Sequence, residues 1–192
     1  MYKGAIMNHK GTKRIETKNL ILRKFELSDA EAMYRNWAND SEVTKFLTWK
    51  PHDSIEVSKS ILKSWIEEYK NKNFYQWAIA LKSNEDEPIG CISIVRQYEE
   101  IGMVHVGYCI GKKWWNQGVT SEALNALIKY FIDEVGANRI ESRHDPLNQN
   151  SGKVMMKCGL KYEGTMRKAD INNQGICDYS MYALLAEEYL RE

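Results

Sequence analysis

A glycine separates an apolar segment from an amphipathic one in the stretch Trp115–Ala123 (WNQGVTSEA). The residues after Gly118 predict a helix, and the first amides of a helix lack partners within it and carry a partial positive charge. Such amides bind phosphate or diphosphate, and a glycine beside them leaves room for the phosphate oxygens. Neither G-x-x-x-x-G-K-[ST] nor G-x-G-x-x-G is present, which disfavours kinase and dehydrogenase chemistry. Taken alone, a glycine before a helix is more often an ordinary turn.

The segment Met103–Ile110 (MVHVGYCI), just before this junction, has the alternation typical of a strand. If Val106 and Tyr108 face one side of a sheet, Gly107 faces the other side and leaves a gap there. A glycine inside a strand marks either a β-bulge or the close approach of another backbone. Both interpretations remain open from the sequence.

The rest of the chain predicts the elements that position these residues. Strands are expected at 20–25, 75–81, 89–95, 103–110 and 139–143, and a final hairpin at 162–171 and 176–184 around the NNQG turn. Helices are expected from a capping box at Ser28 and Glu31, from residue 53 or 54, along an apolar stripe that ends at Val135, and over 151–158. This order predicts an α/β fold, a mixed sheet covered by helices.

The composition is that of a folded chain: of 192 residues, 43% are hydrophobic and 28% charged. A balance of 27 basic and 26 acidic residues gives a formal charge of +1, so we expect neither nucleic acid nor a membrane as a direct partner. No spacing of cysteines or histidines completes a metal site, and no metal is expected. No membrane span or signal peptide is recognisable, so a cytoplasmic protein is expected. We expect residues 1–14 to form a flexible leader and 15–192 a single domain.

Five landmarks in register make the chain similar to a known family. They are LILR at Leu20–Arg23, WWNQG at Trp114–Gly118, N-x-x-S at Asn148–Ser151, Glu163-Gly164, and Gly175 with Asp178. With them the chain resembles the GNAT superfamily of acetyl-CoA-dependent N-acetyltransferases, and within it the Rim-type branch, named for acetylation of ribosomal-protein N-termini. Two positions differ from the broad family pattern: Trp115 replaces Gln or Arg, and Thr120 replaces Gly or Ala.

The resemblance implies a central, mostly antiparallel twisted sheet whose central strands splay apart and are flanked by helices. It also implies acetyl-CoA as the co-substrate, with its diphosphate at the helix after Gly118 and its pantetheine arm along strand 103–110. The cofactor-binding residues that it implies are Val106, Gly107, Tyr108, Gln117, Gly118, Val119, Thr120, Ser121, Asn148 and Ser151.

Three residues are candidates for proton transfer. The resemblance implies Asp170 as the base and Ser151 as the acid that protonates the departing thiolate. His105 stands where many relatives carry a glutamate, and it is the second candidate for the base. Each has a structural alternative: Ser151 as a helix cap, Asp170 as a solvated turn residue, and His105 as a packed or surface histidine.

The resemblance places the acceptor pocket opposite the cofactor entrance, between the first two helices and the final hairpin. Its candidate walls are Trp37, Trp49, Tyr75 and Trp77, although aromatic residues in such stripes are more often core. The expected acceptor is a primary amine, and the resemblance favours a protein or peptide N-terminus. A small-molecule amine, a CoA-binding module without catalysis, and a homodimer remain open.

Overall fold

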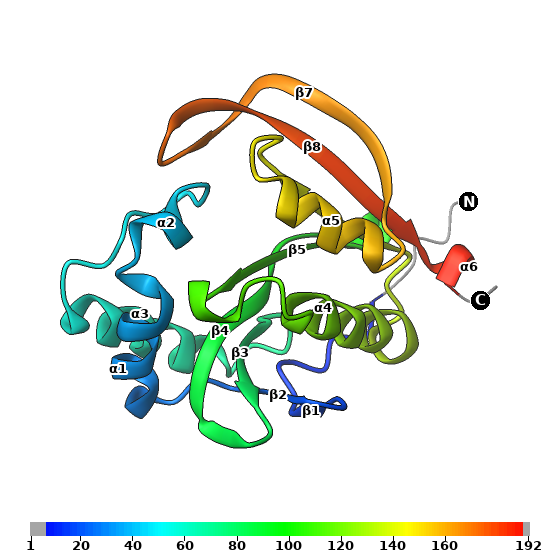
Figure 1. The fold of residues 1–192 in the computed structure, drawn as a ribbon. Helices are drawn as coiled ribbons and strands as arrows, with labels where there is room; N and C mark the ends of the chain where they lie inside the picture. Colours follow the sequence, from blue (N-terminus) through cyan, green and yellow to red (C-terminus); the bar gives the residue numbers. More distant parts are fainter. Residues whose placement is uncertain (1–6, 190–192) are drawn as a thin grey trace.

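One sheet of eight strands runs through the chain in the order β1-β2-β3-β4-β5-β6-β8-β7 (Figure 1). The structure, a computed structural model, describes residues 7–189. All neighbouring strands are antiparallel except β5 and β6, which are parallel. The strands are β1 Ile15–Glu16, β2 Leu20–Arg23, β3 Gln76–Leu81, β4 Asn84–Tyr98, β5 Met103–Ile110, β6 Arg139–His144, β7 Lys161–Asn172 and β8 Gly175–Leu185. The predicted mixed, mostly antiparallel fold is confirmed.

Helices pack on both faces of this sheet (Figure 1). They are α1 Ala30–Met33, α2 Ser41–Thr44, α3 Ile55–Glu68, α4 Val119–Lys129, α5 Gln149–Lys157 and α6 Ala186–Tyr189. Leu124 of α4 shares one core cluster with Val104 of β5. Leu62 of α3 shares the second cluster with Cys109, on the other face of the same strand. Within residues 7–189 no helix is long and apolar enough to cross a membrane.

The two central strands separate along their length, as expected. β5 pairs with β6 only from Met103 to His105, whereas its pairing with β4 continues to Ile110. The edge of β5 that faces β6 is therefore open from Val106 onward. This wedge between β5 and β6 is the geometric feature on which the site depends.

Gly107 lies next to a β-bulge of the neighbouring strand and is not itself the bulged residue. The register of β4 against β5 shifts between Ile94 and Arg96, so that Val95 is the extra residue. A Cβ added to Gly107 would lie 2.9 Å from Val95 Cγ1. Gly107 therefore makes room for the bulged residue of the neighbouring strand.

The first helical segment is capped two residues earlier than predicted. The capping box joins Glu26 and Asp29, and the Glu26 amide donates to Asp29 Oδ2 at 2.8 Å. Arg23 donates to both oxygens of the buried Asp29 at 2.8 Å each. Glu31, the predicted partner of Ser28, is exposed instead. The prediction was wrong because the ion pair with Arg23, which cannot be seen in the local pattern, holds Asp29 at the cap.

The expected flexible leader, residues 1–14, is packed against the sheet from Met7 onward. Met7 is 5% exposed and belongs to the core. The indole nitrogen of Trp77 donates to the carbonyl oxygen of Lys13 at 2.6 Å. The part of that expectation on residues 1–6 lies outside the described residues.

Candidate active site

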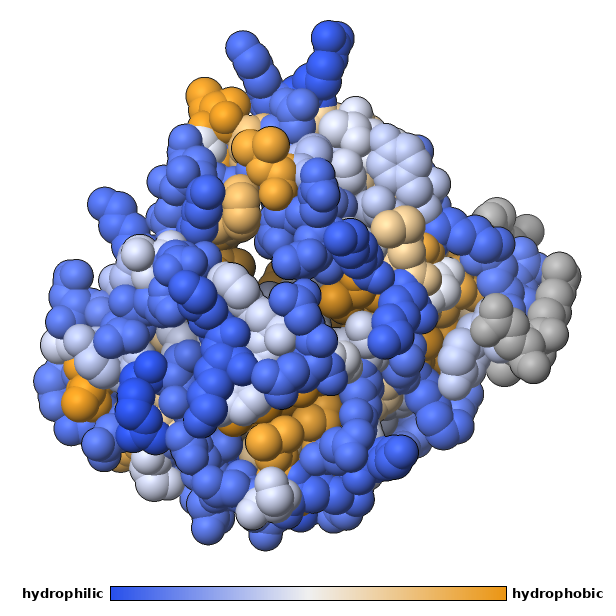
Figure 2. Space-filling view, viewed as in Figure 1, coloured by the Kyte–Doolittle hydropathy of each residue, from blue (hydrophilic) through white to orange (hydrophobic). Residues whose placement is uncertain are grey.

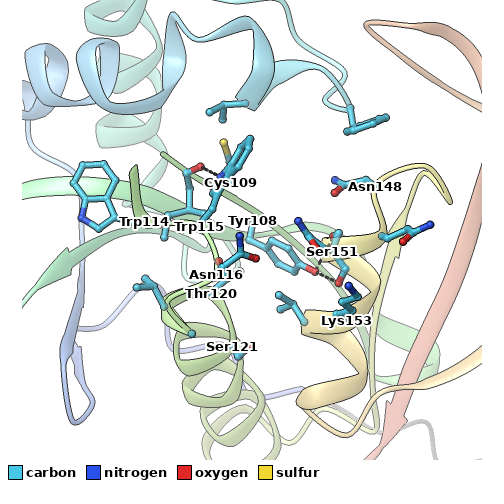
Figure 3. A pocket seen from close by; sticks show the side chains of 18 of the residues that line it. Tyr108, Cys109, Trp114, Trp115, Asn116, Thr120, Ser121, Asn148, Ser151 and Lys153 are labelled. Atoms are coloured by element: carbon cyan, nitrogen blue, oxygen red, sulfur yellow. Dashed lines mark hydrogen bonds between the residues drawn. The ribbon is translucent and has the colours of Figure 1, made fainter. Parts of the chain in front are cut away.

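A cavity of about 580 Å³ lies at the wedge between β5 and β6. Residues 108–110, 118–121 and 148–151, from the end of β5 and the first turns of α4 and α5, form what we call the floor. Lining residues in the range 42–47, from α2 and the turn after it, form what we call the roof. Figure 3 shows floor residues from all three elements around one space, and Figure 2 shows the hollow on a largely hydrophilic face.

The first turn of α4 presents free amides to this cavity. Gly118, the N-cap, has φ of 80° and ψ of −4°, a left-handed conformation that favours glycine. A Cβ added there would meet no atom within 4 Å, so the space in front of the turn is open. The first helical bond runs from the Glu122 amide to the Gly118 carbonyl at 3.0 Å. No side chain caps the turn, which leaves the N–H groups of residues 119–121 available to an anion.

The open edge of β5 presents one residue to the wedge. Ser142 Oγ donates to the carbonyl of Val106 at 2.8 Å, and Trp115 Nε1 donates to the carbonyl of Ile110 at 2.9 Å. Both carbonyls point away from β4, and backbone direction alternates along a strand. The N–H and C=O of Tyr108 therefore face the wedge between these two occupied positions.

Val106 and Gly107, which were expected to bind the cofactor, make contacts within the protein instead. The backbone of Gly107 faces β4, by the same alternation, and the missing side chain accommodates Val95. Val106 is 1% exposed, and its carbonyl already accepts from Ser142. The expectation for these two residues is corrected because the edge that splays apart exposes Tyr108 instead.

Tyr108 and Ser151 meet across the floor. The Tyr108 hydroxyl lies 2.9 Å from Ser151 Oγ and donates to the Ser151 carbonyl at 3.0 Å (Figure 3). Because Tyr108 donates its single proton to that carbonyl, Ser151 Oγ donates to Tyr108. Burial raises the pKa of the Tyr108 phenol above its ordinary value. The helix begins at Gln149, so Ser151 lies within its first turn and is not its N-cap.

Asp170, the first candidate for the base, is held in the β7–β8 hairpin by an arginine. Arg143 Nε lies 3.0 Å from Asp170 Oδ2, and Arg143 Nη2 donates to Oδ1 at 3.2 Å. The amide of Ile171 also donates to Oδ1 at 2.9 Å. Oδ1 therefore already accepts two hydrogen bonds and Oδ2 lies in the ion pair with Arg143, and Asp170 does not line the cavity.

His105, the second candidate, lies in a buried polar cluster on β5. It is 6% exposed, and its Nδ1 lies 3.1 Å from Glu141 Oε1 on β6. Of its two ring nitrogens, only Nδ1 bonds to another residue of the range 7–189. His105 and Glu141 form the last residue pair before β5 and β6 separate.

Three of the four expected aromatic walls are core residues. Trp37 and Trp77 are 0% exposed and Tyr75 is 1% exposed. Tyr75 and Trp77 stack on each other, with ring centroids 5.7 Å apart, and both contact the ring of Phe131. None of the three lines the cavity, so this expectation was wrong for them. Trp49 is partly buried beside the roof, and a role in acceptor binding remains a proposal.

The roof is held by a contact that the sequence did not indicate. The backbone N–H of Asn173, in the turn between β7 and β8, donates to the carbonyl oxygen of Leu47 at 3.1 Å. Its side chain donates to the carbonyls of Thr44 and Trp49 at 2.9 and 2.7 Å. The hairpin tip is thereby tied to a segment more than a hundred residues away in the chain. An asparagine in a turn was the only signal of this contact.

Some of the other residues implied for cofactor binding line the cavity and one does not. Asn148 lines the cavity, as do Thr120 and Ser121 (Figure 3). Gln117 does not line it, since its side chain donates to the Lys113 carbonyl at 2.7 Å. Lys153, on α5, lines the cavity and was missed, because a lysine on an amphipathic helix looks like an ordinary solvated residue. Among residues 7–189 no three His, Cys, Asp or Glu side chains are grouped to hold a metal ion.

The GNAT acetyltransferase domain model matches residues 19–161. The uncharacterized N-acetyltransferase p20 of Bacillus licheniformis is 30% identical over 173 residues, which cover 90% of this chain and 96% of that protein. The crystal structure of a GNAT-family acetyltransferase from Bacillus anthracis has a TM-score of 0.80 and 28% identity, and the match covers 92% of this chain and all of that one. The chain therefore belongs to the GNAT family and is an N-acetyltransferase.

Proteins of the ribosomal-protein acetyltransferase (Rim) type are among the relatives and the structural neighbours. One neighbour is RimL, described as the ribosomal L7/L12 α-N-protein acetyltransferase and solved in complex with coenzyme A. It has a TM-score of 0.81 at 22% identity, covering 92% of this chain and 99% of RimL. At that identity the match bears on the fold alone.

Proposed function

We propose that this N-acetyltransferase transfers the acetyl group of acetyl-CoA to the α-amino group of a protein or peptide N-terminus. The observation that supports it most is the convergence of three features on one cavity. These are the free first turn of α4, the open Tyr108 edge of β5 and the Tyr108–Ser151 hydroxyl pair. The Rim-type landmarks, and the ribosomal-protein acetyltransferases among the sequence relatives, favour an N-terminal acceptor.

The residues present fit coenzyme A. The N–H groups of residues 119–121, with no side chain in front of Gly118, suit the diphosphate. Lys153 adds a positive charge on the neighbouring wall. The C=O of Tyr108 suits an amide of an extended arm, which would add to the edge of β5 as a strand does, and Asn148 offers a further amide side chain. When bound, acetyl-CoA supplies an activated acetyl thioester.

The donors of the floor would stabilise the reacting groups. The Tyr108 N–H can donate to a carbonyl oxygen placed in the wedge, and a fixed donor of this kind is worth more as negative charge develops. The Tyr108–Ser151 pair can deliver a proton to a departing thiolate. Because burial raises the pKa of Tyr108, the phenol stays protonated at assay pH.

The acceptor needs only modest help to lose its proton. An α-amino group has a pKa of about 7.7 to 8.0, so about a tenth or more of it is neutral at pH 7, whereas lysine, near 10.4, is almost fully protonated. Neither candidate base lines the cavity. Both oxygens of Asp170 are engaged by Arg143 or a backbone amide, whereas Nε2 of His105 bonds to no residue in 7–189. These contacts favour His105 as the proton acceptor.

Release of thiol from acetyl-CoA, measured across a panel of amines, tests the proposal. The panel contains lysine-free peptides with a free N-terminus, the same peptides with a blocked N-terminus and one internal lysine, and small amines such as amino acids and polyamines. We expect turnover with the first set alone. Turnover with the small amines alone would show that the acceptor is a small molecule and not a protein N-terminus. Thermal stabilisation by acetyl-CoA without turnover would indicate a binding module.

A further inference from the structure

Glu141 is a buried carboxylate with three partners on three strands. It is 5% exposed and lies on β6. Its Oε1 accepts from Arg96 Nη2 on β4 at 2.9 Å and lies 3.1 Å from His105 Nδ1 on β5. Its Oε2 accepts from Arg139 Nε at 3.1 Å, and Arg139 in turn donates to both oxygens of Glu163 on β7. The two arginines and two glutamates balance in charge without any charge on His105.

These contacts fix which nitrogen of His105 carries the proton. Burial alone raises the pKa of Glu141, but hydrogen bonds from His105 and Arg96 outweigh it and bring the pKa to about 2. Glu141 is therefore ionised at assay pH, and an ionised carboxylate only accepts hydrogen bonds. His105 Nδ1 must donate to it, which leaves the lone pair of the neutral ring on Nε2.

The pair lies at the apex of the wedge, next to the floor and outside the cavity lining. His105 is three residues before Tyr108, about 10 Å along the strand. The side chains of His105, Gly107 and Cys109 alternate onto one face of β5, and Cys109 lines the cavity. Gly107 lies between them and has no side chain, and the side chain of Val95 of β4 occupies the space beside it.

We propose that Glu141 is a positioning residue, which holds the Nδ1–H of His105 so that Nε2 can accept the proton of the acceptor amine, directly or through one water. The inference rests on the proposed function. In the transfer, a C–N bond forms and the C–S bond breaks. The proton of the amine passes to Nε2, and the sulfur takes a proton from the Tyr108–Ser151 pair. Solvent then restores both groups.

The matched variants are Glu141→Gln and Glu163→Gln. Each removes one carboxylate from Arg139, but only Glu141 contacts His105. An amide at 141 can donate to Nδ1 and so select the other tautomer, as occurs when the triad aspartate of a serine protease is replaced by asparagine. We expect Glu141→Gln to lower kcat about 10- to 100-fold, the effect of losing a group that orients a ring nitrogen, with the KM for acetyl-CoA unchanged. Glu163→Gln should keep kcat within about twofold, as a surface carboxylate does.

Ring ¹⁵N chemical shifts give a readout that does not depend on turnover. The chain has four histidines, and the signal lost in His105→Gln assigns this one. In the wild type at pH 8 we expect the neutral ring to carry its proton on Nδ1, and in Glu141→Gln we expect a shift toward Nε2. A wild-type ring protonated on Nε2 overturns the inference even if Glu141→Gln fails to fold.

The two proposals fail in different ways. If no amine in the panel is acetylated, the proposed function fails, and the ¹⁵N measurement still tests the pair. If the wild type is active and Glu141→Gln keeps both the wild-type kcat and the Nδ1–H tautomer, Glu141 has only a structural role and the inference is wrong.

Discussion

The floor and the roof of the cavity present different kinds of chemical group to a ligand. The floor offers backbone groups to the cofactor, the amides of residues 119–121 and the N–H and C=O of Tyr108, beside the hydroxyls of Tyr108 and Ser151. The roof offers side chains, such as Phe46, which lines the cavity. The floor is set by the conformation of a few neighbouring residues, above all Gly118 with its φ of 80°. The roof depends on Asn173, more than a hundred residues further along the chain.

This difference matches what each half must recognise. One cofactor can be held by backbone groups whose spacing needs no particular side chains. An acceptor must be distinguished from other amines, and side chains provide that specificity. We therefore expect changes to the floor to abolish cofactor binding or catalysis, and changes to the roof to alter the acceptor KM alone.

The largest effect is expected from Gly118→Val. A β-branched residue adopts a φ of 80° only with strain of about 1–3 kcal/mol, so the first turn of α4 must change and its N–H groups lose their common direction. We expect the Kd for acetyl-CoA, measured by calorimetry, to weaken at least about 100-fold, or roughly 2.7 kcal/mol.

Gly136→Val is the control for that change. Gly136 also has a φ of 80° with no atom within 4 Å of an added Cβ, and it does not line the cavity. Both variants should lose similar free energy of unfolding, and only Gly118→Val should lose acetyl-CoA. If both variants weakened acetyl-CoA binding equally, the loss would follow from lower stability of the fold and not from the first turn of α4.

The next largest effect is expected on kcat, from replacing the candidate base on β5 rather than the one in the β7–β8 hairpin. His105 belongs to β5, whereas Asp170 belongs to β7 and is paired with Arg143. We expect His105→Gln to lower kcat about 100-fold, the lower range for loss of a general base, and Asp170→Asn to lower it only a few-fold. Steady-state rates with an acceptor found in the panel decide between them. The reverse order would assign the base to the hairpin.

The floor was predictable to the extent that local sequence sets backbone conformation. Gly118 before an amphipathic run predicted the free helix start, and the alternation of β5 predicted a strand there. The strand edge required more, because the pairing with β4 turns Gly107 toward β4 and Tyr108 away from it, and the end of the β6 pairing leaves Tyr108 open. That point is a property of two strands, and one strand's pattern does not contain it.

The roof and its surroundings were poorly predicted for a related reason. Trp77 and Tyr75 were expected as walls because aromatic side chains suit either a pocket or a core, and only packing against Phe131 decides. Asp29 displaced the predicted cap through its ion pair with Arg23. The aromatic residues were decided by packing against a distant segment, and the cap by an ion pair six residues apart that helical spacing does not indicate.

A smaller effect within the floor is expected from Tyr108→Phe, which keeps the ring and removes both hydrogen bonds to Ser151. We expect kcat to fall about tenfold, with the KM for acetyl-CoA unchanged, because the proton donor is lost and the binding groups of the backbone remain. Burial raises the pKa of Tyr108, so the phenol stays protonated to a higher pH than usual and causes no loss of activity below about pH 10. Adding Ser151→Ala to Tyr108→Phe should lower kcat little further if the two hydroxyls act as one unit. If the losses of kcat in the two single variants add up in the double variant, the two hydroxyls act independently.

The smallest effect tests the roof through Phe46→Ala. Phe46 lines the cavity and packs against neither core cluster, so the fold does not need its ring. Removing it should raise the KM for the acceptor about fivefold, as expected for about 1 kcal/mol of apolar contact, and leave the Kd for acetyl-CoA and the melting temperature unchanged. Tyr98→Ala is the matched control, because Tyr98 is 51% exposed and lies away from the cavity. A loss of acetyl-CoA affinity in Phe46→Ala would show that the roof also holds the cofactor, and the division between backbone-built floor and side-chain-built roof would not hold.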